Sequence, residues 1–390
     1  MAIKNKVFWT NPSYKVSPPL KKDIKCKYLI VGGGITGVSV AYFLLKHGAR
    51  DVVLIDKGVV AWGATGRAAG VLTPNVELDL ADLVDAYGKK KGLVFWYGIL
   101  HGLHHMKQII EEEKIDCDYE EDPTLYGEVR HHWKHHAEAA KVLEEYKVQR
   151  KMHMQVHLML ETEVEKEIHT KLFQEGILSH QGVSVSPLKY TQNLAMRLKH
   201  KSVKFYEKTP LLEIKGNVAV TPKGDIRFDK IILATDSAPT IKGTYFNRST
   251  IGVSKRLTDK QMELLGLEHR EMVWDSKIKY HYFKLTKDNR LLMGWGDEKV
   301  KEKDRNKLSR KALKEILRIT KRLFPTANIK FDYAWSASFC QTKELIPRIK
   351  FDGNRIFVLA TSGQPTSTMV AKYVAQKLFG KKVSLDAYFK

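Results

Sequence analysis

The sequence predicts an α/β fold in which separated parts of the chain build one parallel sheet and two inserts build a second domain. Three observations predict it. A short apolar run, residues 28–31, leads into three consecutive glycines, and a second apolar run, residues 51–55, ends on an acid. Similar strand and loop signals return near the middle and the end of the 390-residue chain, with longer stretches between them.

The first predicted element is a strand over residues 28–31, because a continuous apolar run of this length is typical of a strand buried on both faces of a parallel sheet. Gly32, Gly34 and Gly37 then match G-x-G-x-x-G. In this pattern the first glycine makes the turn, the second lets the backbone approach a pyrophosphate, and the third lets helix pack on strand. The helix that follows directs its N-terminal amides at the phosphate.

The second strand, over residues 51–55, leads to the acid that selects the nucleotide. Asp56 lies about 20 residues beyond the last glycine, where an acid accepts hydrogen bonds from the ribose hydroxyls and disfavours a 2′-phosphate. Strand, glycines, helix, strand and acid in this register predict a dinucleotide site, against the alternative of a turn whose glycines serve only packing. The neighbours Ile35, Thr36 and Lys57 join the predicted site.

The next stretch, "AWGATGRAAGVLTP" over residues 61–74, is rich in small residues and carries one charge, Arg67. A flexible surface loop is one interpretation, since glycine and alanine permit it. Backbone lying against a large ligand, with the arginine directed at that ligand, explains the shortage of polar residues better.

At these residues the chain resembles the D-amino-acid oxidase, glycine oxidase and sarcosine oxidase superfamily of FAD-dependent amine oxidoreductases. In that superfamily a GASGRNAG-like or GRNGG-like segment follows the dinucleotide motif. Thr65, Gly66, Arg67 and Gly70 match this segment, whereas Ala68 and Ala69 depart from it. The resemblance implies that Thr65, Gly66, Arg67, Ala68 and Gly70 contact FAD.

The resemblance continues along most of the chain. "YEKTPLLEI" is similar to a segment that contacts the adenine, here through Leu211, and "KIILATDSAP" resembles a strand ending in Ala-Thr-Gly. Asp236 replaces that glycine, and Ala234 and Thr235 are the expected contacts. "YHYFKLTKDNRLLMGWGD" and "WSASFCQTKELIPRI" resemble substrate-domain segments. "FVLATSGQPTSTMVAKYVAQKL" stands where the superfamily has a glycine-rich loop and a final helix, with FAD contacts expected at Gly363, Gln364 and Thr366.

The resemblance implies a Rossmann-like FAD-binding domain and a discontinuous α+β substrate domain built on an antiparallel sheet. We expect the FAD-binding domain in residues 1–88, 182–240 and 342–390, and the substrate domain in residues 89–181 and 241–341. The first insert reads mostly helical, since "LHGLHHMKQIIEEEKI" and "EAAKVLEEYKVQ" carry apolar residues at helical spacing. The second mixes a helix, "RKALKEILRITKRLF", with strands that end in the turn "TKDN".

The chemistry implied by the resemblance is hydride transfer to flavin N5 from a carbon that bears a neutral amine, giving an imine that hydrolyses. The enzyme then supplies orientation, desolvation and charge stabilisation instead of a strong base. We expect Arg67, Tyr280 and Tyr282 to act in the active site. The two tyrosines alternate on one face of a predicted strand, with His281 on the other. The alternative is that the face with the tyrosines is hydrophobic core.

Three positions depart from relatives in that superfamily. The arginine with which glycine oxidases hold a substrate carboxylate would fall at Phe339, and the lysine with which some sarcosine oxidases promote reaction with oxygen would fall at Leu292. The cysteine that anchors a covalent flavin would fall at Ala337, so non-covalent FAD is expected although Cys340 is near. The electron acceptor therefore stays open among oxygen, a quinone and a protein. A dehydrogenase subunit and a non-catalytic flavin-binding subunit are the alternatives.

Composition bounds the remaining functions. The net charge is +22, but the lysines are spread along the chain, which favours a solvated surface over nucleic-acid binding and leaves an acidic partner or peripheral membrane contact open. Three scattered cysteines and the lack of a long apolar segment indicate a protein of the reducing cytoplasm. The paired histidines of "HHWKHH", with Glu128 one turn before, have metal-ligand spacing. A solvated helical face is preferred, and no metal site is expected.

Overall fold

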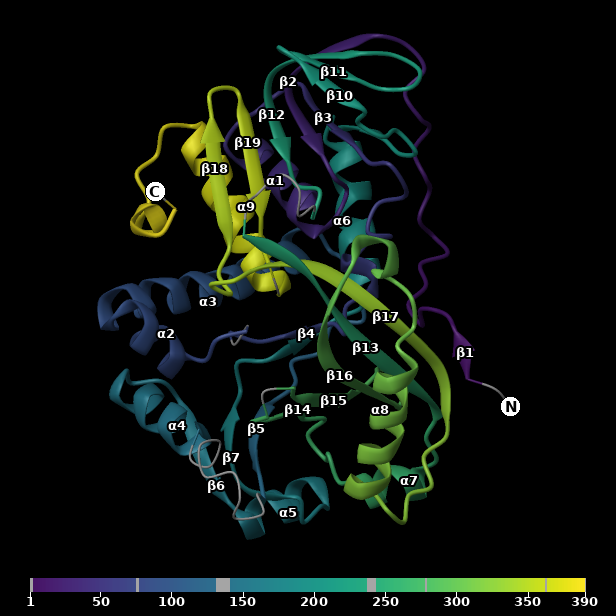
Figure 1. The fold of residues 1–390 in the computed structure, drawn as a ribbon, viewed down its shortest axis with the longest axis vertical. Helices are drawn as coiled ribbons and strands as arrows, with labels where there is room; N and C mark the ends of the chain where they lie inside the picture. Colours follow the sequence, from purple (N-terminus) through teal and green to yellow (C-terminus); the bar gives the residue numbers. More distant parts are fainter. Residues whose placement is uncertain are drawn as a thin grey trace.

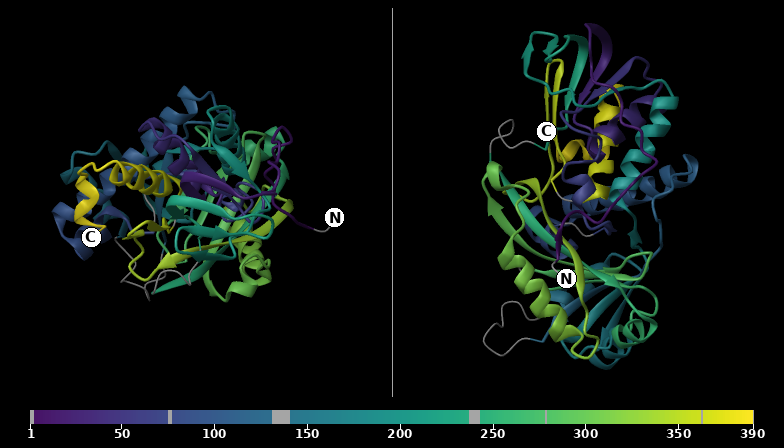
Figure 2. Two further views of the ribbon diagram at one scale, coloured as in Figure 1. Left: turned by 90° about the horizontal axis from the view of Figure 1, so that it is seen from above. Right: turned by 90° about the vertical axis from the view of Figure 1, so that its right-hand side faces the viewer.

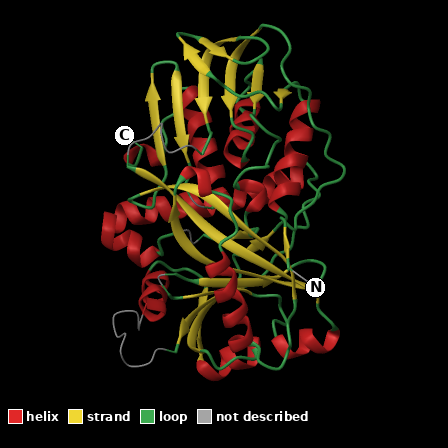
Figure 3. Cartoon of the chain, turned by 45° about the vertical axis from the view of Figure 1, so that its right-hand side comes forward, coloured by secondary structure: helices red, strands yellow, loops and turns green. Residues whose placement is uncertain are grey.

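The computed structural model describes residues 3–74, 77–130, 141–236, 243–277, 279–361 and 363–389. Two sheets dominate this part of the chain (Figure 1). The sheet at the top of the view carries the N-terminal strands and the last strands of the chain, and the larger sheet below comes mainly from the two inserts. Helices lie between and around the two sheets (Figures 2 and 3). The expected α/β class with two domains of different sheet type is confirmed.

The upper sheet has a parallel core. In spatial order its parallel strands are β19 (Arg355–Leu359), β12 (Ile226–Leu233), β2 (Ile24–Val31), β3 (Val52–Ile55) and β9 (Lys204–Tyr206). The predicted strands over residues 28–31 and 51–55 are β2 and β3. Antiparallel neighbours extend the sheet, namely β18 (Arg348–Asp352) beside β19, and the hairpin β10 (Glu213–Lys215) and β11 (Val218–Val220) beside β12. Parallel strands of this kind put their carboxyl ends at one edge, where ligands bind.

Helices share a core with one face of the upper sheet. They are α1 (Ile35–Lys46), α2 (Leu80–Tyr87), α3 (Lys89–Glu112), α6 (Pro187–His200) and α9 (Gln364–Leu378). The opposite face of the sheet packs against Leu20 and the β10–β11 hairpin. Helix α6 begins where the sequence provides both N-terminal signals: Ser186 accepts a hydrogen bond from the Lys189 amide and Pro187 takes the first helical position. Helix α9 packs against α1 and α3, so the last helix of the chain lies beside the first.

The lower sheet is mostly antiparallel. Its order is β1 (Lys4–Asn5), β17 (Phe331–Thr342), β13 (Thr244–Arg256), β16 (Arg290–Val300), β15 (His281–Leu285), β14 (Met272–Asp275), β5 (Thr124–Val129), β7 (Phe173–Ser179) and β6 (Val156–Leu160). The pairs β1–β17 and β14–β5 are parallel. The expected turn over residues 286–289 joins β15 to β16, and the expected second-insert helix is α8 (Arg310–Leu323).

Two hydrophobic cores use opposite faces of the lower sheet. One face packs against α5 (Glu161–Ile168), α7 (Asp259–Leu265) and α8. The other face contributes Ile251, Leu292 and Trp335 to the core that also holds α1, α3 and α9. Helix α4 (Lys141–Lys151) lies on this second face, farther along the sheet. The sheet therefore turns one face toward the nucleotide-binding half of the molecule.

The first insert differs from the mostly helical segment expected. It contains α3, α4 and α5, but also strands β5, β6 and β7. All six residues of β5 are buried, so its sequence shows no alternation of apolar and polar residues. Glu128 lies in strand β5 and not on a helix. Its carboxylate accepts hydrogen bonds from the Ser276 hydroxyl and from the Val142 amide. The histidines of residues 131–136 lie outside the described residues.

The domain boundaries stay a prediction, and two elements contact the domain to which they were not assigned. Strand β1 falls in the first FAD-binding segment but pairs with β17 of the lower sheet. Helix α3 falls in the first insert but packs on α2 and α9. Short elements complete the described fold: β4 (Val71–Leu72), β8 (Val183–Ser184), η1 (Thr65–Arg67), η3 (Glu302–Asp304) and η4 (Ser384–Ala387).

Candidate functional site

A cavity of about 1400 Å³ is lined by residues from both sheets. On one side are the carboxyl ends of β2, β3 and β12, the start of α1 and the loop over residues 57–71. On the other side are side chains of β13, β15 and β17. One continuous cavity thus joins the predicted dinucleotide motif to the face of the lower sheet.

The three motif glycines have different surroundings. Gly32 has φ +111°, and a Cβ there would lie 2.3 Å from the Ala234 carbonyl oxygen. A Cβ at Gly37 would lie 1.9 Å from the Gly32 carbonyl oxygen, so Gly37 serves the contact between α1 and β2. A Cβ at Gly34 would meet only Thr65 Oγ1, at 3.2 Å, and Gly34 lines the cavity. Gly34 is therefore the position where backbone is open to a phosphate.

The acid after β3 is held by backbone amides. Asp56 accepts hydrogen bonds from the amides of Gly33 and Gly58, each at 2.6 Å. Burial raises the pKa of the Asp56 carboxyl, while these two hydrogen bonds act against the rise. The carboxylate is fixed beside the glycine turn and lines the cavity, where its remaining lone pairs are available to hydroxyl donors.

Three side-chain donors hold the small-residue loop in place. Trp335 Nε1 donates to the Arg67 carbonyl and Trp9 Nε1 to the Ala68 carbonyl, both at 2.8 Å. Lys284 Nζ donates to the Gly70 carbonyl at 3.2 Å from a fully buried position. Because these donors occupy carbonyls, the loop is anchored to both the N-terminal segment and the lower sheet.

Arg67 is one of the residues that line the cavity. Its Nε is buried and has no hydrogen-bond partner among the described residues, and no described acid forms an ion pair with it. Burial lowers the pKa of Arg67. These surroundings differ from those of a surface arginine paired with a neighbouring acid and favour a ligand-facing position, although its catalytic role stays a prediction.

Asp236 explains the departure from the Ala-Thr-Gly pattern. It has φ +49°, a left-handed conformation that glycine adopts without strain and aspartate tolerates. Its carboxylate accepts from the Cys340 amide at 2.7 Å and from Arg305 Nη2 at 2.5 Å. The end of β12 is thereby tied to β17. Ala337 lines the cavity, whereas the buried Cys340 is not part of its wall.

The start of α9 forms another part of the wall. Gly363 precedes the helix with φ +86°, and both Gly363 and Gln364 line the cavity. The buried Oε1 of Gln364 accepts no hydrogen bond from the described residues. Thr366 is buried in α9 and is not part of the wall.

Tyr280 and Tyr282 line the cavity, as the alternation predicts, with ring centroids 6.0 Å apart. A Cβ at Gly294, the neighbour of Tyr282 on β16, would lie 1.9 Å from the tyrosine ring, so this glycine gives the ring its space. His281 points to the other face, where its Nδ1 lies 2.7 Å from Asp275 Oδ2.

The sequence prediction named Phe339 but missed Asn247 and Lys299, which form a row with it across three strands. Asn247 on β13 pairs with Lys299 on β16 and with Phe339 on β17, and all three line the cavity. Nearby, Gln341 Oε1 accepts from Tyr245 Oη and Asn247 Nδ2, both at 2.9 Å, while Gln341 Nε2 is buried without a partner among the described residues. The alternation Tyr-x-Asn-x-Ser-x-Ile from residue 245 was the available signal.

The remaining predicted residues divide into two groups. Those that line the cavity are Ile35, Thr36, Lys57, Thr65, Ala68, Gly70, Leu211, Ala234 and Thr235. Those behind its wall are Gly37, Gly66 and Thr366. A Cβ at Gly66 would lie 2.1 Å from the Ala61 carbonyl oxygen, so this glycine, like Gly37, is required by packing.

These residues fit FAD. The cavity is large, has an open glycine backbone at a helix N-terminus for the pyrophosphate, and offers a fixed carboxylate for the ribose. The unpartnered Arg67 Nε and Gln364 Oε1 add polar groups with unused hydrogen-bonding capacity.

Among the helices in the described part of the chain, none has the length and the apolar character needed to span a membrane.

Comparisons with known proteins agree with this fold. The γ-glutamylputrescine oxidoreductase of Escherichia coli is 24% identical over 383 residues, which cover 95% of this chain and 87% of the relative. The glycine oxidase structure of Geobacillus kaustophilus superposes with a TM-score of 0.78 at 17% identity, covering 94% and 98% of the two chains. The L-proline dehydrogenase structure of P. horikoshii gives 0.76 at 17% identity, covering 94% and 96%.

The family model described as "DAO: FAD dependent oxidoreductase" matches residues 27–377, which is most of the chain. The match begins within β2 and ends in α9, so it includes every residue that lines the cavity. The protein belongs to this family of FAD-dependent oxidoreductases.

Proposed function

We propose that the enzyme oxidises a C–N bond of an amine or amino acid that also carries a carboxylate. The observation that carries the proposal is the single cavity that runs from the glycine motif to the polar and aromatic face of β13, β15 and β17. This arrangement lets a small substrate lie between a bound flavin and the lower sheet.

Bound FAD supplies the acceptor for a hydride. The chain itself supplies position: Gly34 and Asp56 hold the nucleotide end, and Tyr280 and Tyr282 form a wall against which a substrate is oriented. Arg67 places a positive charge in the cavity, where it stabilises negative charge on the reduced cofactor. The substrate amine must arrive neutral, so no general base is needed to remove a proton from it. Exclusion of water by the two tyrosines contributes more to hydride transfer than a general base does.

The carboxylate preference rests on basic side chains of the cavity wall. Lys277, Lys279, Lys299 and Lys303 all line the cavity. Lys299 belongs to the row that includes Phe339, and its Nζ lies 4.5 Å from the centroid of the Tyr245 ring. A lysine on this row can hold a carboxylate although Phe339 cannot. Glycine, proline and γ-glutamylputrescine, named for three similar proteins, all combine an amine nitrogen with a carboxylate.

A quinone or a protein is the acceptor that we favour over oxygen. Leu292, where some sarcosine oxidases have a lysine, is fully buried in the core and does not line the cavity. It therefore offers no cation near the flavin to promote reaction with oxygen. We also place the enzyme in the reducing cytoplasm, because Cys26, Cys117 and Cys340 are buried free thiols.

A substrate panel tests the proposal. The purified holoenzyme is mixed with N-alkyl amino acids and γ-glutamyl amines, with matched 2-hydroxy acids that lack the nitrogen and matched amines that lack the carboxylate, and turnover is followed with a quinone dye or with oxygen. We expect activity with compounds that carry both groups, and a KM for them that is raised about tenfold or more in Lys299→Met. Turnover of the hydroxy acids alone contradicts C–N oxidation.

A further inference from the structure

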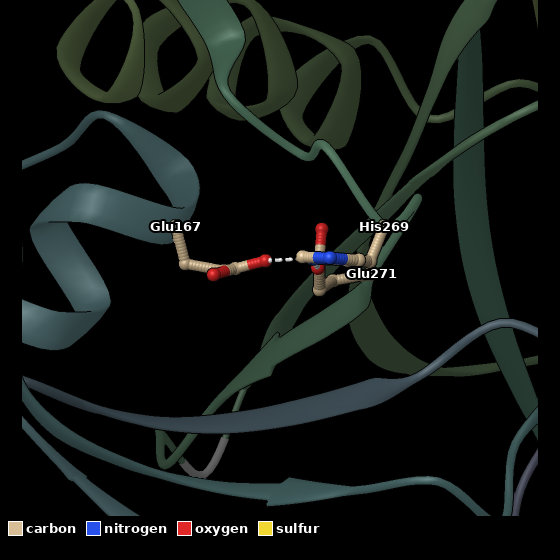
Figure 4. A group of neighbouring side chains, drawn as sticks. All are labelled: Glu167, His269 and Glu271. Carbon is tan, nitrogen blue, oxygen red and sulfur yellow. Dashed lines mark hydrogen bonds and ion pairs between the residues drawn. The ribbon is translucent and has the colours of Figure 1, made fainter.

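Three side chains converge outside the FAD cavity, where α5 meets the segment before β14. Glu167 comes from α5, and His269 and Glu271 come from the segment that enters β14 (Figure 4). His269 Nδ1 lies 2.6 Å from Glu167 Oε1 and 3.2 Å from Glu271 Oε1. A ligand atom of each residue lies within 4.8 Å of those of the other two, which matches one shared coordination centre.

The Glu271 carboxyl is the unusual member of this group. Its side chain is 1% exposed, and no other described residue donates a hydrogen bond to either of its oxygens. A buried carboxylate without partners is costly, and the nearby Glu167 carboxylate adds repulsion. The neighbouring His269 imidazole is 67% exposed and is charged only when protonated. Within the described residues, His269 is the one basic side chain in an ion pair with either carboxylate, so the two carboxylates share a single partner.

The backbone fixes this arrangement. The Leu267 amide donates to the Glu167 carbonyl at 2.8 Å, which joins the end of α5 to the segment that carries His269 and Glu271. Gly266 has φ +68°, and a Cβ there would lie 2.4 Å from the same carbonyl oxygen. The two elements are thus held together independently of the three side chains, so the ligand atoms are brought close before any ion binds.

We propose that Glu167, His269 and Glu271 bind a divalent transition-metal cation, for which Zn²⁺ is the best match. One imidazole nitrogen and two carboxylate oxygens are common ligands of Zn²⁺, whereas Mg²⁺ and Ca²⁺ prefer oxygen ligands alone. The exposed side of His269 leaves a position for water. None of the three residues lines the FAD cavity, so the ion has a structural role and links α5 to β14.

The test uses full-length holoenzyme stripped of metal with a chelator and then supplied with ZnCl₂ at pH 7.5. Thermal unfolding and calorimetric titration are measured for the wild type, Glu271→Gln, His269→Ala and the matched control Glu268→Gln, an exposed acid of the same segment. The control also corrects for Zn²⁺ held by histidines elsewhere, such as His101, His104 and His105. Flavin absorbance reports that each variant is folded.

We expect Zn²⁺ at about 100 times its dissociation constant to raise Tm by about 3 °C in the wild type and in Glu268→Gln. In Glu271→Gln and His269→Ala the strongest binding phase should weaken by about 100-fold or more, and the shift should disappear. His269 is exposed, so His269→Ala keeps the test decisive if Glu271→Gln does not fold. Equal Zn²⁺ shifts in all four proteins, no shift in the wild type, or an equal shift with MgCl₂ would each overturn the proposal.

Discussion

Gly34→Ala separates ligand binding from folding at the glycine motif. Gly34 has φ −73° and ψ 176°, an extended conformation that alanine adopts without strain. The added Cβ meets only Thr65 Oγ1, at 3.2 Å, and otherwise enters the cavity. The stability of the FAD-free chain should therefore stay within about 1 kcal/mol of wild type. The methyl group blocks the approach of the phosphate to the backbone amides, which removes at least one charged hydrogen bond worth about 1.5–3 kcal/mol.

The expected result is a rise of about 10- to 100-fold in the dissociation constant of FAD, measured by titrating the FAD-free protein and following flavin fluorescence. Gly63→Ala is the matched control, because a Cβ there meets nothing within 4 Å and Gly63 lies in the loop of the same cavity. Gly37→Ala should lose stability instead, since its Cβ would lie 1.9 Å from a carbonyl oxygen. FAD affinity in Gly34→Ala within twofold of wild type would refute the position assigned to the pyrophosphate.

Four further predictions follow from the same site. Asp56→Ala should weaken FAD binding by about 1–3 kcal/mol in the same titration, and an unchanged dissociation constant would remove Asp56 from the site. Arg67→Ala should lower the flavin reduction potential, measured by spectroelectrochemistry, while most FAD binding is kept; a wild-type potential would favour a purely structural arginine. Acid precipitation should release all FAD into the supernatant, because Cys340 is not in the cavity wall, and flavin left on the denatured chain would contradict this. Burial lowers the pKa of Lys284 to about 8, so between pH 8 and 10.5 the unfolded chain binds one more proton than the folded chain and stability rises with pH. Lys284→Met should lack this rise of about 3 kcal/mol in denaturant titrations, and an unchanged pH profile would show that Lys284 is not the group involved.

The parts of the fold that the sequence predicts are those with local patterns. Strands β2 and β3, helix α1 and helix α8 each carry their own periodicity and their own glycine, cap or acid within a few residues. Strand β5 was missed because it is buried along its whole length, which removes the alternation that identifies a strand.

The residues of the site, too, could be predicted only where a local sequence pattern marks them. Gly34, Asp56 and Arg67 are adjacent to the motif that predicts them. The row formed by Lys299, Asn247 and Phe339 depends on the register between three strands, and no local pattern specifies which residues face one another across such a sheet. Asp236 stood out in the sequence as a departure, but only the backbone conformation explains why an acid can replace glycine there.

Single-turnover reduction of the bound flavin tests the central claim most directly. The holoenzyme is mixed without oxygen with the best amine of the panel, in normal form and with deuterium on the carbon that bears the nitrogen, and the loss of visible flavin absorbance is followed. C–N oxidation at this cavity predicts that the flavin bleaches and that deuterium slows the bleaching several-fold. Bleaching by the matched hydroxy acid with none by the amine would contradict it.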